Sequence, residues 1–207
     1  MSMTILYPLG ENLYVNMTNR CNCSCTFCLR SMRNHVRESD NLWLEHEPSV
    51  EEVLEDGKKF NFSDYKEIVF CGFGEPTERL TDLLTVASKW KEENPGLIIR
   101  LNTNGLSDLR FKEDTAKRMA GIIDKVSVSM NSSNPEHYLA LTRSIFGIQS
   151  YDAMLQFGAN CKKHGIDVRF SIVDVLSPEE IEECKRRSGA LGVPLKIRKY
   201  NDEKDNK

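Results

Sequence analysis

The chain has 207 residues, of which 40% are hydrophobic and 29% are charged, and its formal net charge is −3. This composition excludes a disordered or collagen-like chain and predicts one large folded domain or two small ones. The slight acidic excess does not favour nucleic acid as the main partner, because phosphate binding requires a cationic surface. No apolar run approaches the ~20 residues of a membrane-spanning helix. Residues 1–10 lack the pattern of a secretory signal, so we expect a cytoplasmic protein.

Short apolar runs alternate with amphipathic stretches along the whole chain. The predicted strands cover residues 4–7, 12–17, 67–71, 97–101, 126–130, 168–173 and 195–197, and the first two can form a hairpin. The predicted helices cover residues 48–60, 78–93, 112–120, 135–142, 150–164 and 178–191. Strands that alternate with helices predict a parallel α/β sheet with right-handed crossovers. Such folds carry their chemistry in the loops that follow the strands.

Four of the seven cysteines lie within eight residues: Cys21, Cys23, Cys25 and Cys28. An odd cysteine count without a secretory signal argues against a disulfide framework. Cysteines that lie this close together in a sequence usually bind an iron–sulfur cluster, zinc or copper(I). Three of them can hold three corners of a [4Fe–4S] cube and leave one iron open, as a catalytic metal site requires. The alternative is a zinc site with Cys23 as a fourth ligand, although zinc sites usually join separated cysteine pairs.

The spacing Cys21-x3-Cys25-x2-Cys28 resembles the signature of the radical S-adenosylmethionine (SAM) enzymes, with Phe27 before the last cysteine. The resemblance continues at Gly72-Phe-Gly-Glu-Pro76, Leu101-Asn-Thr-Asn-Gly105 and Val128-Ser-Met-Asn131, in the expected order. It covers about residues 12 to 200. It implies a single-domain partial (β/α)6 barrel over residues 1–200, with residues 201–207 as a polar tail.

In more detail, the opening and the Cys-Thr-Phe-Cys-Leu-Arg run are similar to the radical SAM proteins that are associated with TatD-type nucleases. That resemblance implies a functional link to a nuclease, which would be a separate protein because this chain carries no metal-dependent nuclease motif.

The resemblance to the superfamily implies a [4Fe–4S] cluster and SAM as cofactors, with Cys21, Cys25 and Cys28 as the metal ligands. The open iron binds SAM, and an electron from the cluster cleaves it to methionine and a 5′-deoxyadenosyl radical that abstracts hydrogen. A reductant such as flavodoxin or ferredoxin is then a partner. The substrate is unidentified, and it is expected to be small or delivered by another protein. Cys23 becomes a spare thiol that faces away.

Four residues near the first two motifs are implied as cofactor contacts. Glu75 would accept a hydrogen bond from the ammonium group of SAM. Gly72 and Gly74 would let the backbone approach the ligand without a Cβ clash, although an ordinary strand-to-helix turn also explains them. Phe27 would pack against adenine, with core packing as the alternative.

Four more cofactor contacts are implied after the third and fourth motifs. Thr103 and Ser129 resemble positions that contact the carboxylate of SAM, and Asn131 resembles a ribose-contacting position; turn formation is the alternative for all three. Arg143 can neutralise a carboxylate or form a surface salt bridge.

No residue identifies the substrate, so several reactions stay open. The small chain also suits an activase that places a glycyl radical on a partner protein, and the nuclease association suggests a nucleotide- or base-modifying enzyme. Outside the enzymes, the cysteine cluster would suit a zinc-binding or redox-sensing module.

Overall fold

The computed structural model describes residues 3–31, 34–35 and 39–199, so the predicted polar tail lies outside the described residues. The described residues form one sheet whose strand order follows the sequence. The strands are β1 (Leu6–Leu9), β2 (Asn12–Val15), β3 (Glu67–Phe70), β4 (Ile99–Thr103), β5 (Lys125–Ser129), β6 (Asp167–Val173) and β7 (Leu195–Arg198). The β1–β2 pair is antiparallel, and every later pair is parallel. This sheet is consistent with the partial radical SAM barrel that the resemblance implies.

Helices connect the parallel strands, as the alternating pattern predicts. They are α1 (Val50–Gly57), α2 (Leu80–Glu93), α3 (Ser107–Phe111), α4 (Thr115–Met119), α5 (Pro135–Thr142), α6 (Ser150–Lys163) and α7 (Pro178–Ala190). A capping box between Ser49 and Glu52 starts α1. Asn134 and Ser177 cap α5 and α7, each directly before a proline in the first turn.

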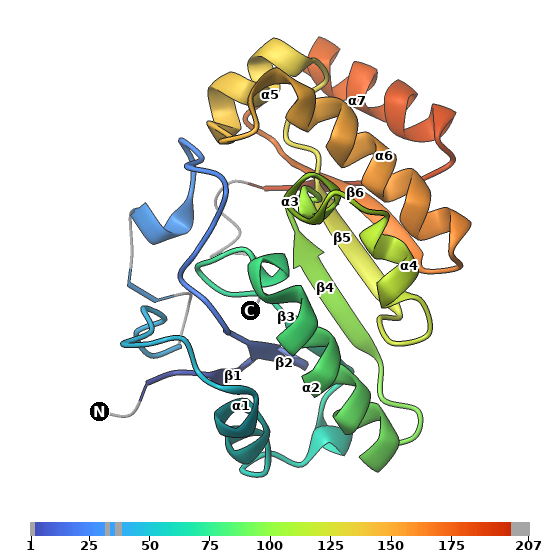
Figure 1. The fold of residues 1–207 in the computed structure, drawn as a ribbon. Helices are drawn as coiled ribbons and strands as arrows, with labels where there is room; N and C mark the ends of the chain where they lie inside the picture. Colours follow the sequence, from blue (N-terminus) through green and yellow to red (C-terminus); the bar gives the residue numbers. More distant parts are fainter. Residues whose placement is uncertain (1–2, 32–33, 36–38, 200–207) are drawn as a thin grey trace.

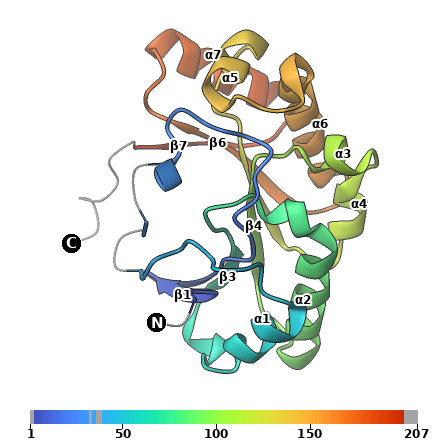
Figure 2. The ribbon, with the colours of Figure 1, turned by 60° about the vertical axis from the view of Figure 1, so that its left-hand side comes forward.

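The two faces of the sheet differ in polarity. In β4, buried Ile99 and Leu101 alternate with half-buried Arg100 and Asn102. The apolar side packs against the helices, for example through stacking of the Phe70 ring on Trp90 of α2. Figures 1 and 2 show these helices on one side of the curved sheet. We call the opposite, more polar side the inner face.

Most predicted elements are confirmed with shifted ends. The predicted hairpin is confirmed, but its turn lies at Gly10–Glu11, and residues 8–9 belong to β1. The helix predicted over residues 112–120 is wrong in extent, because two short helices, α3 and α4, occupy this region. Lys112 has a left-handed backbone (φ 56°) and ends α3, and Asp114 caps α4.

In the described part of the chain, no helix is both long and apolar enough to cross a bilayer.

Candidate functional site

The motif residues gather where the parallel strands end. The cysteine loop, residues 21–28, follows β2, and Glu75 follows β3. Thr103 and Ser129 are the last residues of β4 and β5. Because parallel strands end at one edge of the sheet, these segments lie close together, and the contacts below show that they touch.

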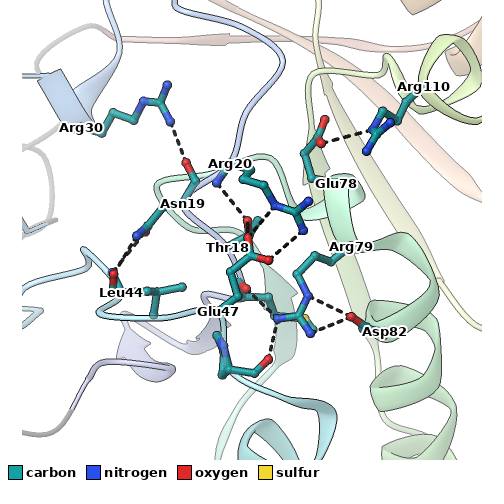
Figure 3. A network of polar contacts seen from close by, with 12 residues as sticks. Thr18, Asn19, Arg20, Arg30, Leu44, Glu47, Glu78, Arg79, Asp82 and Arg110 are labelled. Atoms are coloured by element: carbon teal, nitrogen blue, oxygen red, sulfur yellow. Dashed lines mark hydrogen bonds and ion pairs between the residues drawn. The ribbon is translucent and has the colours of Figure 1, made fainter.

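The segment that leads into the cysteine loop is held by side chains from elsewhere in the chain (Figure 3). The Asn19 side chain donates to the Leu44 carbonyl at 2.8 Å and accepts from the Leu44 N–H at 3.1 Å. The Arg30 guanidinium donates to the carbonyl oxygens of Asn19 at 3.1 Å and Cys23 at 3.4 Å. Arg30 therefore fixes the loop from its far end while placing a positive charge beside the thiols.

Two more arginines support the same segment (Figure 3). Arg79 donates to the Met17 carbonyl at 3.0 Å and is oriented by Asp82 at 2.6 Å. Arg20 forms two hydrogen bonds to Glu47, at 2.7 and 2.8 Å. These contacts order the loop entry without any ligand, which reduces the conformational entropy that ligand binding would cost.

The cysteine loop also pairs with the end of α5. The Ser24 N–H donates to the Thr142 carbonyl and the Thr26 N–H donates to the Leu141 carbonyl, both at 2.9 Å. These carbonyls belong to the last turn of α5, where helix carbonyls lack partners in the helix itself. The loop therefore satisfies the helix end, and the helix in turn fixes the loop.

All seven cysteines are free in this structure. Hydrogen bonding from the Cys23 thiol lowers the pKa of Cys21 and Cys25, although burial opposes the shift. The same two contacts, together with burial, raise the pKa of Cys23. The prediction that Cys23 faces away is wrong, because its buried thiol lies between Cys21 and Cys25. It keeps its proton and favours the thiolate form of its neighbours, which is the form that binds metal.

The three thiols are the donor set that an iron–sulfur cluster takes from a protein. Cys21, Cys25 and Cys28 are half-buried and free, and the Arg30 charge favours the thiolate form of each, although burial raises the pKa of Cys28 above its ordinary value. In the described residues, no three His, Cys, Asp or Glu side chains stand close enough together to hold one metal ion. A tetrahedral zinc site would need sulfur ligands converging at ~2.3 Å from the ion. A cube, in contrast, takes its ligands at separate corners.

Glu75 is buried beneath the cysteine loop with four hydrogen-bond donors on its carboxylate. Oε1 accepts from the Thr77 N–H at 3.1 Å, the Thr77 hydroxyl at 2.7 Å and the Thr103 hydroxyl at 2.7 Å. Oε2 accepts from the Asn104 N–H at 2.8 Å. Burial raises the pKa of Glu75 more than these donors lower it. Since a carboxylate oxygen has two lone pairs, Oε2 keeps one acceptor position for the predicted ammonium contact.

Asn104 connects Glu75 to the cysteine loop. Its backbone N–H binds Glu75, and its side chain donates to Asn22 Oδ1 at 2.7 Å and Cys23 Sγ at 3.6 Å. Asn22 in turn donates to Glu78 at 3.1 Å. The loops after β2, β3 and β4 therefore form one hydrogen-bonded unit around the thiols.

Contacts within the protein explain why positions 72 and 74 carry glycine. A Cβ on Gly74 would lie 2.5 Å from the Arg20 carbonyl oxygen and would also clash with the Thr18 carbonyl oxygen. A Cβ on Gly72 would clash with Asn16 Oδ1. The glycines thus let the loop after β3 pack against the chain that leads into the cysteine loop. Cofactor contact at either position stays a prediction.

The remaining residues predicted to contact the cofactor differ in whether their polar groups already have hydrogen-bond partners in the protein. The Thr103 hydroxyl is occupied, because it donates to Glu75 and accepts from the Gly105 N–H. Asn131 has a left-handed backbone (φ 58°), and its buried Oδ1 has no partner in the described residues. Ser129 is half-buried at the end of β5. The ligand contacts of all three stay predictions.

Phe27 and Arg143 flank the cysteine loop. Phe27 is half-buried and lies outside both hydrophobic clusters of the described residues, so core packing does not account for it. Arg143 is exposed, and its left-handed backbone (φ 48°) ends α5. Its side chain makes no ion pair within the described chain. Their roles in cofactor binding also stay predictions.

Two residues near the site escape sequence reasoning. Tyr138 of α5 is fully buried, and its hydroxyl has no partner in the part of the chain described here. Glu180 of α7 accepts hydrogen bonds from Ser132 and His137 beside the Asn131 turn. Tyr138 looks like an apolar position of an amphipathic helix, and Glu180 belongs to no motif, so no pattern could indicate either.

Comparison with protein families settles the relationship that these motifs indicate. The family model of the Radical SAM superfamily matches residues 15–186, which include the cysteine loop and the motifs after β3, β4 and β5. The chain belongs to the radical SAM superfamily. It is therefore an enzyme of that superfamily, whose members use a [4Fe–4S] cluster and SAM.

Relatives of this radical SAM chain include several cyclases. A GTP 3′,8-cyclase of Corynebacterium glutamicum is 30% identical over 150 residues, covering 65% of this chain and 34% of that protein. A probable GTP 3′,8-cyclase of Thermococcus kodakarensis is 29% identical over 189 residues, covering 90% and 55%. The chain thus spans about a third to just over half of these relatives' length. The narrower resemblance to the TatD-associated group stays a prediction.

Solved structures share the fold of this radical SAM chain. Native anSMEcpe with bound AdoMet superposes with a TM-score of 0.63 at 18% identity, covering 90% of this chain and 50% of that one. HydG, a maturase of the [FeFe]-hydrogenase, gives a TM-score of 0.62 at 16% identity, covering 91% and 42%. At these identities the likeness concerns the fold alone.

Proposed function

We propose that this chain reductively cleaves SAM and directs the resulting radical to abstract hydrogen from a bound substrate. The observation that carries the proposal is the arrangement of Cys21, Cys25 and Cys28, three free thiols beside Arg30 in a loop fixed from both ends. When bound, the cluster would supply the electron that breaks SAM into methionine and a 5′-deoxyadenosyl radical. A flavodoxin or ferredoxin is the proposed reductant.

The chain's own residues would hold and orient SAM. Cys21, Cys25 and Cys28 would ligate the iron and leave one coordination position open. The free lone pair of Glu75 Oε2 would receive the ammonium group, because Thr77, Thr103 and Asn104 hold the carboxylate in a fixed orientation. The unpartnered Asn131 Oδ1 would accept a hydrogen bond from the ribose.

The test is 5′-deoxyadenosine formation by anaerobically reconstituted, reduced protein. We expect wild type to form it and Cys25→Ala to form none. Cys184→Ala is the matched control, because Cys184 is buried on α7, away from the loop, and should keep the activity. Undiminished cleavage by Cys25→Ala would contradict the ligand assignment.

A specific observation favours a nucleotide as the substrate. A cavity of about 270 Å³ opens at the start of strands β5 to β7, and its lining includes Arg100, Lys125, Arg169 and Lys196, with Asp167 as the acidic member. Cations therefore dominate this cavity.

Glu67 partly offsets these cations. It pairs with Arg100 at 2.9 Å and with Lys125 at 2.8 Å. Burial alone would raise the pKa of Glu67, but Lys125, Arg100 and Arg169 hold it below its ordinary value. The excess of positive charge suits the phosphate groups of a substrate whose reacting part lies at the other end of the strands, beside the thiols, since guanidinium groups bind phosphate oxygens in pairs. Relatives named GTP 3′,8-cyclase support the same substrate class.

Binding of GTP, with guanosine as the uncharged comparison, tests this assignment. We expect GTP to bind more tightly than guanosine, and Arg169→Gln to weaken GTP binding by about tenfold, the loss of roughly one charge-assisted contact. Arg186→Gln is the control, because Arg186 pairs with Glu183 on the exposed face of α7. Equal binding of GTP and guanosine would contradict a phosphate site.

A further inference from the structure

Tyr138 is a buried residue whose hydroxyl forms no hydrogen bond within the described chain. Its side chain is fully buried in α5, and its hydroxyl has no hydrogen-bond partner in the described residues. Buried hydroxyl groups are almost always paired, because burying an unpaired one costs free energy. A phenylalanine would fill the same space without that cost, so packing alone does not explain a tyrosine here.

The neighbouring Tyr151 is also buried, but its hydroxyl has a hydrogen-bond partner. The rings of Tyr138 and Tyr151 meet edge to face, with centroids 5.6 Å apart. The Tyr151 hydroxyl donates to the Ser133 carbonyl at 2.9 Å. The two residues therefore share one aromatic contact, but only Tyr151 has its hydroxyl satisfied by the protein.

The helix that carries Tyr138 contacts the cysteine loop directly. The carbonyl of Tyr138 accepts from the Thr142 hydroxyl, and the carbonyls of Thr142 and Leu141 hold the cysteine loop. Burial raises the pKa of Tyr138 well above its usual value. The phenol therefore stays protonated and is a donor.

Few acceptors remain free at this end of the site. Glu75 already receives four donors from the protein. Cys23 is protonated and receives the Asn104 side chain. Two other acceptors, the second lone pair of Glu75 Oε2 and the unpartnered Asn131 Oδ1, are assigned to SAM by the proposed function. The metal-binding sulfurs are then the acceptors left for the phenol.

We propose that the Tyr138 hydroxyl donates a hydrogen bond to a sulfur of the cluster, either a ligating thiolate or an inorganic sulfide. This inference rests on the proposed function, since it requires the cluster to be bound at Cys21, Cys25 and Cys28. Tyr138 is then a positioning residue that acts on the cluster. A donor to cluster sulfur stabilises the reduced, more negative form, so it raises the reduction potential.

The test compares Tyr138→Phe with the matched control Tyr151→Phe, which removes a hydroxyl from the same aromatic pair. In the metal-free protein, Tyr138→Phe should unfold at the same temperature as wild type or a few degrees higher, because it removes an unsatisfied group. Tyr151→Phe should unfold at a lower temperature, because it loses the bond to Ser133.

The decisive readout is the reduction potential of the reconstituted cluster. We expect Tyr138→Phe to take up iron and sulfide as wild type does, with the equilibrium for reduction about tenfold less favourable, which corresponds to a potential ~59 mV more negative. Tyr151→Phe should leave the potential unchanged.

Three outcomes would overturn the inference. Equal potentials in wild type and Tyr138→Phe, both with full clusters, would overturn it alone. A metal-free Tyr138→Phe protein that is destabilised as much as Tyr151→Phe would show a structural hydroxyl and overturn it as well. A wild-type protein that takes up no cluster would overturn the proposed function and this inference with it.

Discussion

The sequence indicates that Glu75 belongs to the site, but it does not show which residues hold its carboxylate. The glycine-glutamate-proline motif indicates its importance, but the motif does not indicate that Thr77, Thr103 and Asn104 fix its carboxylate. Those contacts connect the loops after β3 and β4. Glu75 therefore supports the structure of the site in addition to its proposed contact with SAM.

Glu75→Gln should destabilise the protein even without cofactors. The glutamine amide group must replace one carboxylate oxygen, so an N–H group would face protein donors instead of accepting from them. We expect a loss of about 1–3 kcal/mol in the free energy of unfolding, measured by urea denaturation. Glu93→Gln, an exposed change in α2, is the control and should have little effect. An unchanged Glu75→Gln protein would mean that these four contacts are not formed.

For single residues, the sequence predicts which side chains take part in the chemistry, but it does not predict which other residues they contact. The spacing of Cys21, Cys25 and Cys28 and the motif around Glu75 suffice to propose their roles. The reason for Gly74 is not readable, because the carbonyls of Thr18 and Arg20 that would clash with a Cβ lie more than fifty residues away. The unpartnered hydroxyl of Tyr138 is equally invisible, since it depends on the packing of α5 against the cysteine loop.

Among the elements, α7 supports the turn that carries Asn131. Glu180 Oε1 accepts from the Ser132 hydroxyl at 2.7 Å, the Ser133 N–H at 3.2 Å and His137 Nδ1 at 2.8 Å. Burial would raise the pKa of Glu180, but these hydrogen bonds hold it below its ordinary value. The turn that follows the left-handed Asn131 is thereby fixed by a helix that belongs to none of the motifs.

Stability should depend on pH through Glu180. Because the folded pKa is lowered, the ionised carboxylate stabilises the folded state above the usual glutamate pKa of 4.5, and this contribution is lost as the pH falls below it. Glu180→Gln should therefore cost about 1 kcal/mol near neutral pH, and the difference from wild type should shrink on acidification. Thermal unfolding at several pH values measures it.

Glu182→Gln is the control for this experiment, because Glu182 forms an exposed surface ion pair with Lys185. A Glu180→Gln difference that stays constant from neutral to acidic pH would contradict a role for the ionised carboxylate.

Element boundaries follow from the sequence only where capping residues mark them. Ser49, Asn134 and Ser177 cap α1, α5 and α7 close to the predicted starts. The break between α3 and α4 was not predictable, because Lys112 adopts a left-handed backbone that normally favours glycine. Residues 107–120 contain no glycine or proline that would indicate a break.

The described chain is a curved sheet with helices on one side (Figures 1 and 2). The alternation of strands and helices is enough to predict the parallel sheet, because each helix can bury its apolar stripe only against the sheet. The cationic cavity at Arg100, Lys125 and Arg169 could not be predicted, because the strands that bring these residues together are far apart in the sequence. One end of the strands thus carries the thiols, and the other carries the positive charge.

The central claim is that three cysteines of this chain hold a cluster with one iron open to SAM. Electron paramagnetic resonance of the reconstituted, reduced protein, recorded with and without SAM, tests it most directly. We predict a reduced [4Fe–4S] signal that changes when SAM is added, that is lost in Cys21→Ala, Cys25→Ala and Cys28→Ala, and that persists in Cys23→Ala. A signal that SAM does not change, or one that survives in Cys25→Ala, would contradict the account.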